Sequence, residues 1–78
     1  MDCIGERNSK NNLHGRGIAI YPSGNIIIGY WDDGLYAPGN FIRIFSDGDV
    51  DVGEWYLKDG RMHRRGTWYK KDGTSQNY

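Results

Sequence analysis

Apolar and polar positions alternate along this chain in short segments that are separated by glycine turns. Residues 17–21 and 25–31 are rich in β-branched and aromatic side chains and flank a turn at Gly24, and residues 41–45 and 49–55 repeat this plan around Gly48. A period of two is typical of β-strands, and glycine supplies the positive φ that tight turns need. No window places apolar residues at helical spacing. The pattern predicts an all-β chain, an antiparallel β-hairpin meander in a single elongated twisted sheet, with a third hairpin turning near Gly73.

The same segments recur 24 residues apart. The sequence YPSG at 21–24 returns as FSDG at 45–48, and GYW at 29–31 returns as GEW at 53–55. A third register aligns LHGRG at 13–17 with LYAPG at 35–39 and MHRRG at 62–66. Self-similarity at this period indicates stacked supersecondary units. Our interpretation is one domain, 1–78, with a half unit at 3–12 and repeats at about 13–34, 35–60 and 61–78.

Alternation divides the return strands into two faces. Trp31 and Trp55 lie on one face together with glycines, which leave room for an aromatic ring from a neighbouring strand. We expect each tryptophan to lie over a glycine of an adjacent strand. The predicted structural core consists of Trp31, Trp55, Gly17, Gly29, Gly53 and Gly66.

The opposite face of these strands is aliphatic. It carries Ile26, Ile28, Val50 and Val52. Each exposed aliphatic side chain forgoes about 1.5–3 kcal/mol that burial would supply. We therefore expect a partner, a second copy or a terminal segment to cover this candidate partner interface. Residues 1–12 are short and polar, so a partner suits the role at least as well.

The motifs at 13–17, 29–34, 53–60 and 62–66 resemble those of MORN-repeat proteins. The family's unit has the pattern Y-x-G-x-W, a short glycine turn, [LM]-H-G-x-G, a six-residue strand and D-G, and the resemblance covers about residues 3–73. The chain departs from it where Ile27 and Asp51 replace the first tyrosine. Two extra residues between Gly39 and Gly48 predict a bulge at Asn40 and Phe41. The chain starts and ends in mid-unit, which predicts unpaired strand edges.

The resemblance implies a non-catalytic role. We expect a protein–protein interaction module or structural subunit that docks into a larger assembly, in the cytoplasm or on the cytoskeleton or an organelle. A phospholipid or membrane-surface association module is one alternative, and an accessory module of an enzyme complex is another. Protein partners are expected, membrane lipid is the alternative partner, and neither nucleic acid nor a cofactor is expected.

Composition limits the other possibilities. The 78 residues suffice for one domain of marginal stability, and ten basic side chains balance ten acidic ones. Zero net charge gives no drive toward nucleic acid or an acidic membrane. Cys3 is the single cysteine, so neither an intrachain disulfide nor a zinc cluster is expected. The sequence shows no signal peptide and no membrane-spanning segment, which favours an intracellular protein.

Candidate catalytic residues are few. His14 and His63 align in the repeat, which indicates a structural role, and no phosphate loop or nucleophile motif occurs. We expect no enzymatic activity and no metal site. The carboxylates are expected mostly at turns, where aspartate caps the backbone: Asp32, Asp33, Asp47, Asp49, Asp51, Asp59 and Asp72. Two basic pairs are candidate anion contacts, although charges that protect a strand edge are the favoured reading: Arg64, Arg65, Lys70 and Lys71.

Overall fold

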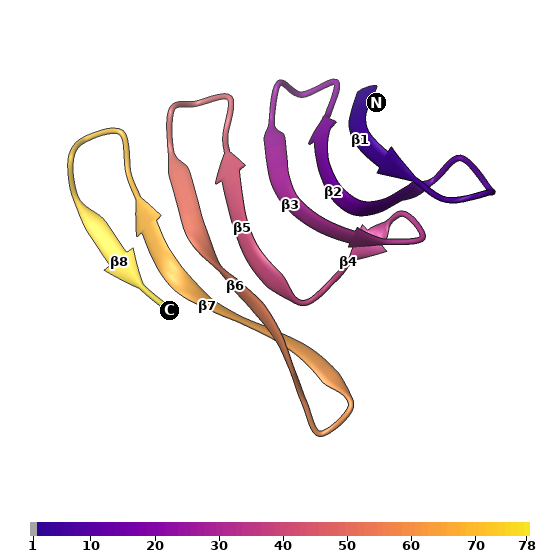
Figure 1. Ribbon diagram of the computed structural model, residues 1–78. Coiled ribbons are helices and arrows are strands. Elements are labelled where there is room, and N and C mark those ends of the chain that lie inside the picture. The colour runs from indigo at the N-terminus through magenta and orange to yellow at the C-terminus, as the bar shows by residue number, and fades with distance from the viewer. Residues whose placement is uncertain (1) are drawn as a thin grey trace.

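The chain forms one antiparallel β-sheet. The computed structural model describes residues 2–78 and contains no helix in that range, which confirms the predicted all-β meander (Figure 1). The strand order is β1-β2-β3-β5-β6-β7-β8, and the short β4 pairs with the end of β3. No helix within residues 2–78 is long and apolar enough to cross a membrane. The strands are β1 (Asp2–Arg7), β2 (Leu13–Ile20), β3 (Ile26–Asp32), β4 (Leu35–Tyr36), β5 (Gly39–Ile44), β6 (Val50–Lys58), β7 (Arg61–Tyr69) and β8 (Ser75–Asn77).

Three turns at one end of the sheet share one geometry. Gly24, Gly48 and Gly73 have φ values of 92°, 103° and 93°, which only glycine adopts readily. The N–H of each glycine donates to the carbonyl three residues earlier, at 2.9, 3.0 and 3.0 Å. These are the turns that the sequence predicted.

Two Asp-Gly turns lie at the other end of the sheet, and they place Asp33 and Asp59 at turns, as expected from the sequence. Both residues have positive φ in Asp33-Gly34 and in Asp59-Gly60, the conformation of a type I′ hairpin turn. The second turn joins β6 to β7, so these two strands continue past their neighbours. We call residues 56–63 the arm, and Figure 1 shows it projecting from the sheet.

A row of glycines crosses the sheet, and Phe41 interrupts it. Gly5, Gly17 and Gly29 pair in register on one side of this residue, and Phe41 itself pairs with Gly53. The predicted bulge at Asn40 and Phe41 is therefore wrong, because both residues pair regularly with β6. Phe41 lies 24 residues after Gly17 and takes the place of that residue in the row, so the sequence alignment of Gly39 with Gly17 is shifted by two residues. The irregularity in the described strands lies in β1, between Gly5 and Arg7.

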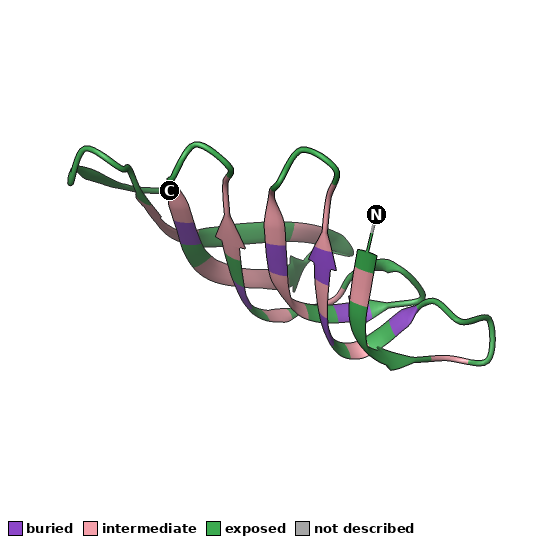
Figure 2. Ribbon diagram, turned by 90° about the horizontal axis from the view of Figure 1, so that it is seen from above, coloured by how far each residue is buried: buried purple, intermediate pink, exposed green. Residues whose placement is uncertain are grey.

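The sheet is a single layer with all its buried side chains on one face. The molecule measures 42 × 33 × 14 Å. Within residues 2–78 no second layer covers the sheet, and Figure 2 shows the curved strands as one layer coloured by burial. The buried side chains are therefore covered by their neighbours in the same sheet. The buried face, called the aromatic face below, also carries Trp55 and Trp68 by strand alternation. Its buried side chains are those of Leu13, Ala19, Ile27, Trp31, Phe41 and Asp51, and Gly17 is buried among them.

Candidate functional site

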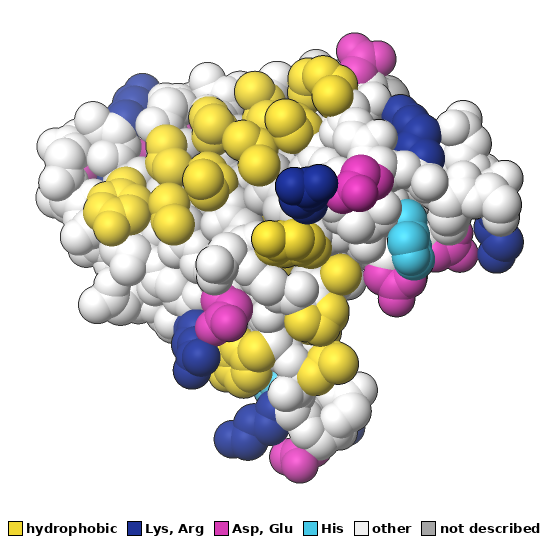
Figure 3. All heavy atoms as spheres, in the orientation of Figure 1, with side chains coloured by type: hydrophobic (Ala, Val, Ile, Leu, Met, Phe, Trp, Pro, Cys, Tyr) yellow, Lys and Arg dark blue, Asp and Glu magenta, His cyan; other side chains and the backbone are white. Residues whose placement is uncertain are grey.

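Two rows of aliphatic side chains cross the sheet on the face opposite the tryptophans. Cross-strand pairing fixes both rows, and Figure 3 shows hydrophobic side chains gathered in a band on this face. We call it the aliphatic face. It extends the four residues predicted from sequence to nine: Ile4, Ile18, Ile28, Ile42 and Val52 in one row, and Ile20, Ile26, Ile44 and Val50 in the other.

None of these nine side chains is buried. Ile4 is 61% exposed and Val52 is 41% exposed, while Ile26, Ile28 and Val50 are half-buried. The N-terminal segment does not cover the face, because it forms β1 within the sheet and adds Ile4 to the apolar row. Within the described chain, the aliphatic face therefore remains open to solvent.

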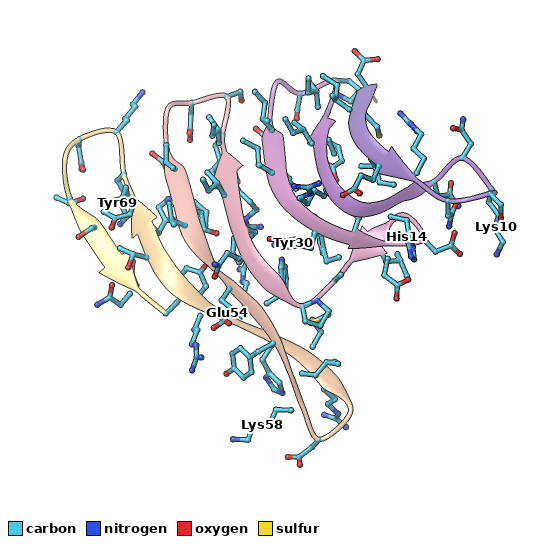
Figure 4. All side chains as sticks on the ribbon, viewed as in Figure 1. Lys10, His14, Tyr30, Glu54, Lys58 and Tyr69 are labelled. Atoms are coloured by element: carbon cyan, nitrogen blue, oxygen red, sulfur yellow. The ribbon has the colours of Figure 1, made fainter. Side chains whose placement is uncertain are left out.

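A shallow groove runs beside the first aliphatic row. Its volume is about 530 Å³, and glycines of the central row form part of its lining. The side chains of Arg16, Tyr30 and Asn40 border it opposite the isoleucines. Figure 4 shows Tyr30 on β3 and Glu54 on β6, two of the strands that carry the band. Tyr69, which is 50% exposed, lies at the end of β7. The groove therefore has an apolar wall and a polar wall.

Four charges on this face form two ion pairs. Arg16 lies 3.1 Å from Glu6 through its Nε, and Arg65 lies 2.9 Å from Glu54 through its Nη2. The backbone N–H and the guanidinium of Arg16 hold the pKa of Glu6 below its ordinary value. The guanidinium of Arg65 also lies 4.9 Å from the ring centre of Tyr56. These charges cancel locally, so the face carries no cationic cluster.

The aromatic face contains the two predicted core tryptophans in different surroundings. Trp31 lies over Gly17 and donates its indole N–H to the carbonyl of that residue at 3.0 Å. Trp55 does not lie over a glycine in this way: its ring stacks on Tyr36, with centroids 5.0 Å apart, and tilts against Phe41. The indole N–H of Trp55 is buried without a hydrogen-bond partner. The indole N–H of Trp31 therefore has a hydrogen-bond partner, whereas that of Trp55 has none within the described chain.

The predicted core glycines allow close strand approach. A Cβ on Gly66 would meet the carbonyl of Val52 and the Cα of Gly53 in the adjacent strand. A Cβ on Gly29 or Gly53 would approach Phe41, at 3.2 Å from its Cβ and 3.1 Å from its ring tip respectively. Phe41 therefore occupies the space that these two glycines leave.

A buried ion pair on the aromatic face was missed in the sequence. Asp51 is fully buried, and it accepts hydrogen bonds from Nε of Arg43 at 2.9 Å and from the Tyr78 hydroxyl at 2.5 Å. The expectation that Asp51 lies at a turn is wrong, because it pairs with Arg43 inside the β5–β6 ladder. Burial, followed by the bond to Asp51, raises the pKa of Tyr78 to about 12. The signal was available, since a hairpin centred on 45–49 puts positions 43 and 51 opposite each other.

The four candidate anion contacts are not brought together. Arg64 lies on the aromatic face, 5.0 Å from the ring centre of Tyr78, whereas Arg65 pairs with Glu54 on the aliphatic face. Lys70 and Lys71 lie in the turn at the far end of β7. At about 3.3 Å per strand residue, the two basic pairs are roughly 20 Å apart along the strand. They do not form a common anion site.

The two histidines have separate structural contacts. His14 accepts a hydrogen bond from the backbone N–H of Asp33 through its Nδ1 at 3.2 Å. His63 stacks on Tyr56 in the arm, with ring centres 5.6 Å apart. Within residues 2–78, no three histidine, cysteine, aspartate or glutamate side chains are placed to hold a metal ion.

Comparison with protein-family models, curated proteins and solved structures finds no significant match to this chain. The resemblance to MORN repeats therefore remains a prediction from the sequence motifs.

Proposed function

We propose that this chain is a non-catalytic protein-docking module and that its aliphatic face is the docking surface. The observation that carries the proposal is the open double row of nine isoleucine and valine side chains on a single-layer sheet. Water contact with this band forgoes burial energy at every position, and contiguous apolar surface of this kind marks interaction sites. The MORN resemblance adds the expectation of a structural role in a larger assembly.

The charges beside the band favour a protein over a membrane surface as the partner. Anionic lipid is recognised by clusters of Lys and Arg. On the aliphatic face, however, Arg16 and Arg65 are each paired with a glutamate. Paired charges at the border of an apolar centre are the usual anatomy of a protein–protein interface.

The test is a comparison of two double variants as baits in an extract of the cells that make the protein. I28K/V52K places two charges in the middle of the aliphatic face. L35K/L57K is the matched control, because Leu35 and Leu57 are 73% and 61% exposed and lie outside the band. We expect the wild-type and the control to retain the same bound proteins and I28K/V52K to lose them.

Folding and lipid binding are measured on the same proteins. Far-ultraviolet circular dichroism should give the same β spectrum for all three. Retention of the bound proteins by a folded I28K/V52K variant would contradict the proposal. Flotation of the wild-type with vesicles of neutral and anionic phospholipid, without other protein, would favour the membrane alternative instead.

A further inference from the structure

The side of the sheet that carries the aliphatic face is large enough for a standard interface between two folded chains. The sheet extends over 42 × 33 Å, and a standard interface needs about 800 Å² from each partner. Both aliphatic rows run across the strands, so they form a continuous band beside a shallow groove rather than a deep pocket. Apolar faces of two twisted sheets pack against one another about 10 Å apart, with strand directions within about 30°. A second sheet therefore fits this band.

A two-fold axis makes the band complementary to itself. In a face-to-face pair whose axis runs along the strands between β3 and β5, the strand order brings β3 opposite β5, β2 opposite β6 and β1 opposite β7 of the second copy. Ile28 then lies opposite Ile42 of the second copy, and Ile18 lies opposite Val52, because these residues share one cross-strand row. Each contact occurs twice, as in any isologous dimer.

The same axis brings opposite charges together. Across the sheet from β1 to β7, the charged border reads Glu6, Arg16, Glu54 and Arg65. The two-fold rotation reverses this order in the second copy. Arg16 therefore lies opposite Glu54 of the second copy, and Glu6 lies opposite Arg65 of the second copy. If the two charges of either ion pair were exchanged between their strands, like charges would face each other across the interface. Long side chains allow these contacts despite the rotation between packed sheets.

We propose that two copies of this chain pair through their aliphatic faces as a two-fold symmetric β-sandwich. The inference rests on the proposed function, because it names a second copy as the protein that the face docks. The apolar rows form the buried centre of the interface. Each border carries four charges, those of Glu6 and Arg16 from one copy and those of Glu54 and Arg65 from the other. Zero net charge means that no overall repulsion opposes the pairing.

The decisive test uses two charge-exchange variants. E6R/R16E and E54R/R65E each keep their ion pair within the chain but exchange its signs. Each variant alone brings like charges together across the interface, and we expect its dimer dissociation constant to rise at least tenfold. An equimolar mixture of the two restores opposite charges at both borders, so it should form a heterodimer, and the quadruple variant should dimerise like the wild-type.

Sedimentation velocity gives the readout, with the wild-type expected at twice the chain mass of 8.9 kDa. Circular dichroism confirms that each variant is folded. Exchange variants that dimerise as tightly as the wild-type overturn the proposal, and so does a mixture that stays monomeric. A wild-type chain that is monomeric at hundreds of micromolar overturns it without any variant.

A second measurement needs only the wild-type. Ile18 and Val52 are three strand spacings apart within one chain, about 14 Å, which is beyond the range of a nuclear Overhauser effect. Isotope-filtered spectra of a mixed labelled and unlabelled sample should show contacts between their methyl groups across the interface. Absence of such contacts in a dimeric sample overturns the proposed arrangement.

The two proposals fail differently. A monomeric chain that still loses its bound proteins in I28K/V52K refutes the sandwich and leaves the docking face intact. Methyl contacts between Ile18 and Val52, together with capture that I28K/V52K does not change, establish the sandwich and refute docking of other proteins through this face.

Discussion

Replacing Arg43 with methionine should remove a large share of the stability of this domain. The substitution leaves the fully buried carboxylate of Asp51 without its cation, and breaking one partner of a buried pair costs about 3–5 kcal/mol. The Tyr78 hydroxyl still donates to Asp51, so we expect a loss near 3 kcal/mol. At roughly 0.05–0.15 kcal/mol per residue, a chain of 78 residues has a total of about 4–12 kcal/mol.

The assay is urea denaturation followed by tryptophan fluorescence at one fixed protein concentration. With a slope near 1 kcal/mol/M, a loss of about 3 kcal/mol moves the midpoint by roughly 3 M. R43M/D51L removes both charges, and we expect it to recover most of the loss, because apolar replacement of a buried pair is often neutral. Lys10→Met is the matched control, since its pair with Asp33 is exposed and should contribute no more than about 1 kcal/mol.

Two results would refute this reasoning. One is a loss below about 1 kcal/mol in R43M, which would mean that water reaches Asp51. The other is a double variant that is no more stable than R43M, which would mean that the pair is needed for packing rather than for charge balance.

Two further predictions concern the aromatic face. The pKa of Tyr78 is about 12 in the folded chain against 10.0 ordinarily, so its contribution to stability is complete below pH 10 and is lost as the pH rises toward 12. Absorbance titration at 295 nm should show one late-titrating tyrosine in the wild-type that the Y78F variant lacks. A Y78F variant that titrates like the wild-type would refute the contact with Asp51. Trp31→Ala should lower the free energy of unfolding by about 3–5 kcal/mol. Trp55→Phe should lower it by under about 1.5 kcal/mol, because this substitution also removes a buried N–H that has no partner. Thermal melts that reverse this order would contradict the hydrogen-bonding difference between the two tryptophans.

The fold class could be read from the sequence because its determinants are local. Alternating side chains assign a face to every strand residue, and the glycine turns fix the register of each hairpin. The position of Trp31 over Gly17 follows from this register. The turns at Asp33-Gly34 and Asp59-Gly60 also have a local signal, an aspartate followed by a glycine.

The surroundings of Trp55 and the contact of Asp51 with Tyr78 depend on non-local packing, which alternation does not specify. Phe41 stands at a position of the glycine row, and its ring fills the space over Gly53. The extent of the aliphatic face was underestimated for a similar reason. Only the pairing of β1 with β2 shows that Ile4 continues the row.

The single-layer meander has a consequence for how the chain folds. The substantial contacts join strands that are consecutive along the chain, except for β3 and β5, which flank the short β4. Each pairing therefore closes a loop of limited length, which costs little entropy. Any hairpin can nucleate, and each further strand can add to an edge that already exists. Denaturation should accordingly begin by fraying at β1 and β8, and native-state hydrogen exchange should show protection rising from both outer strands toward β3, β5 and β6.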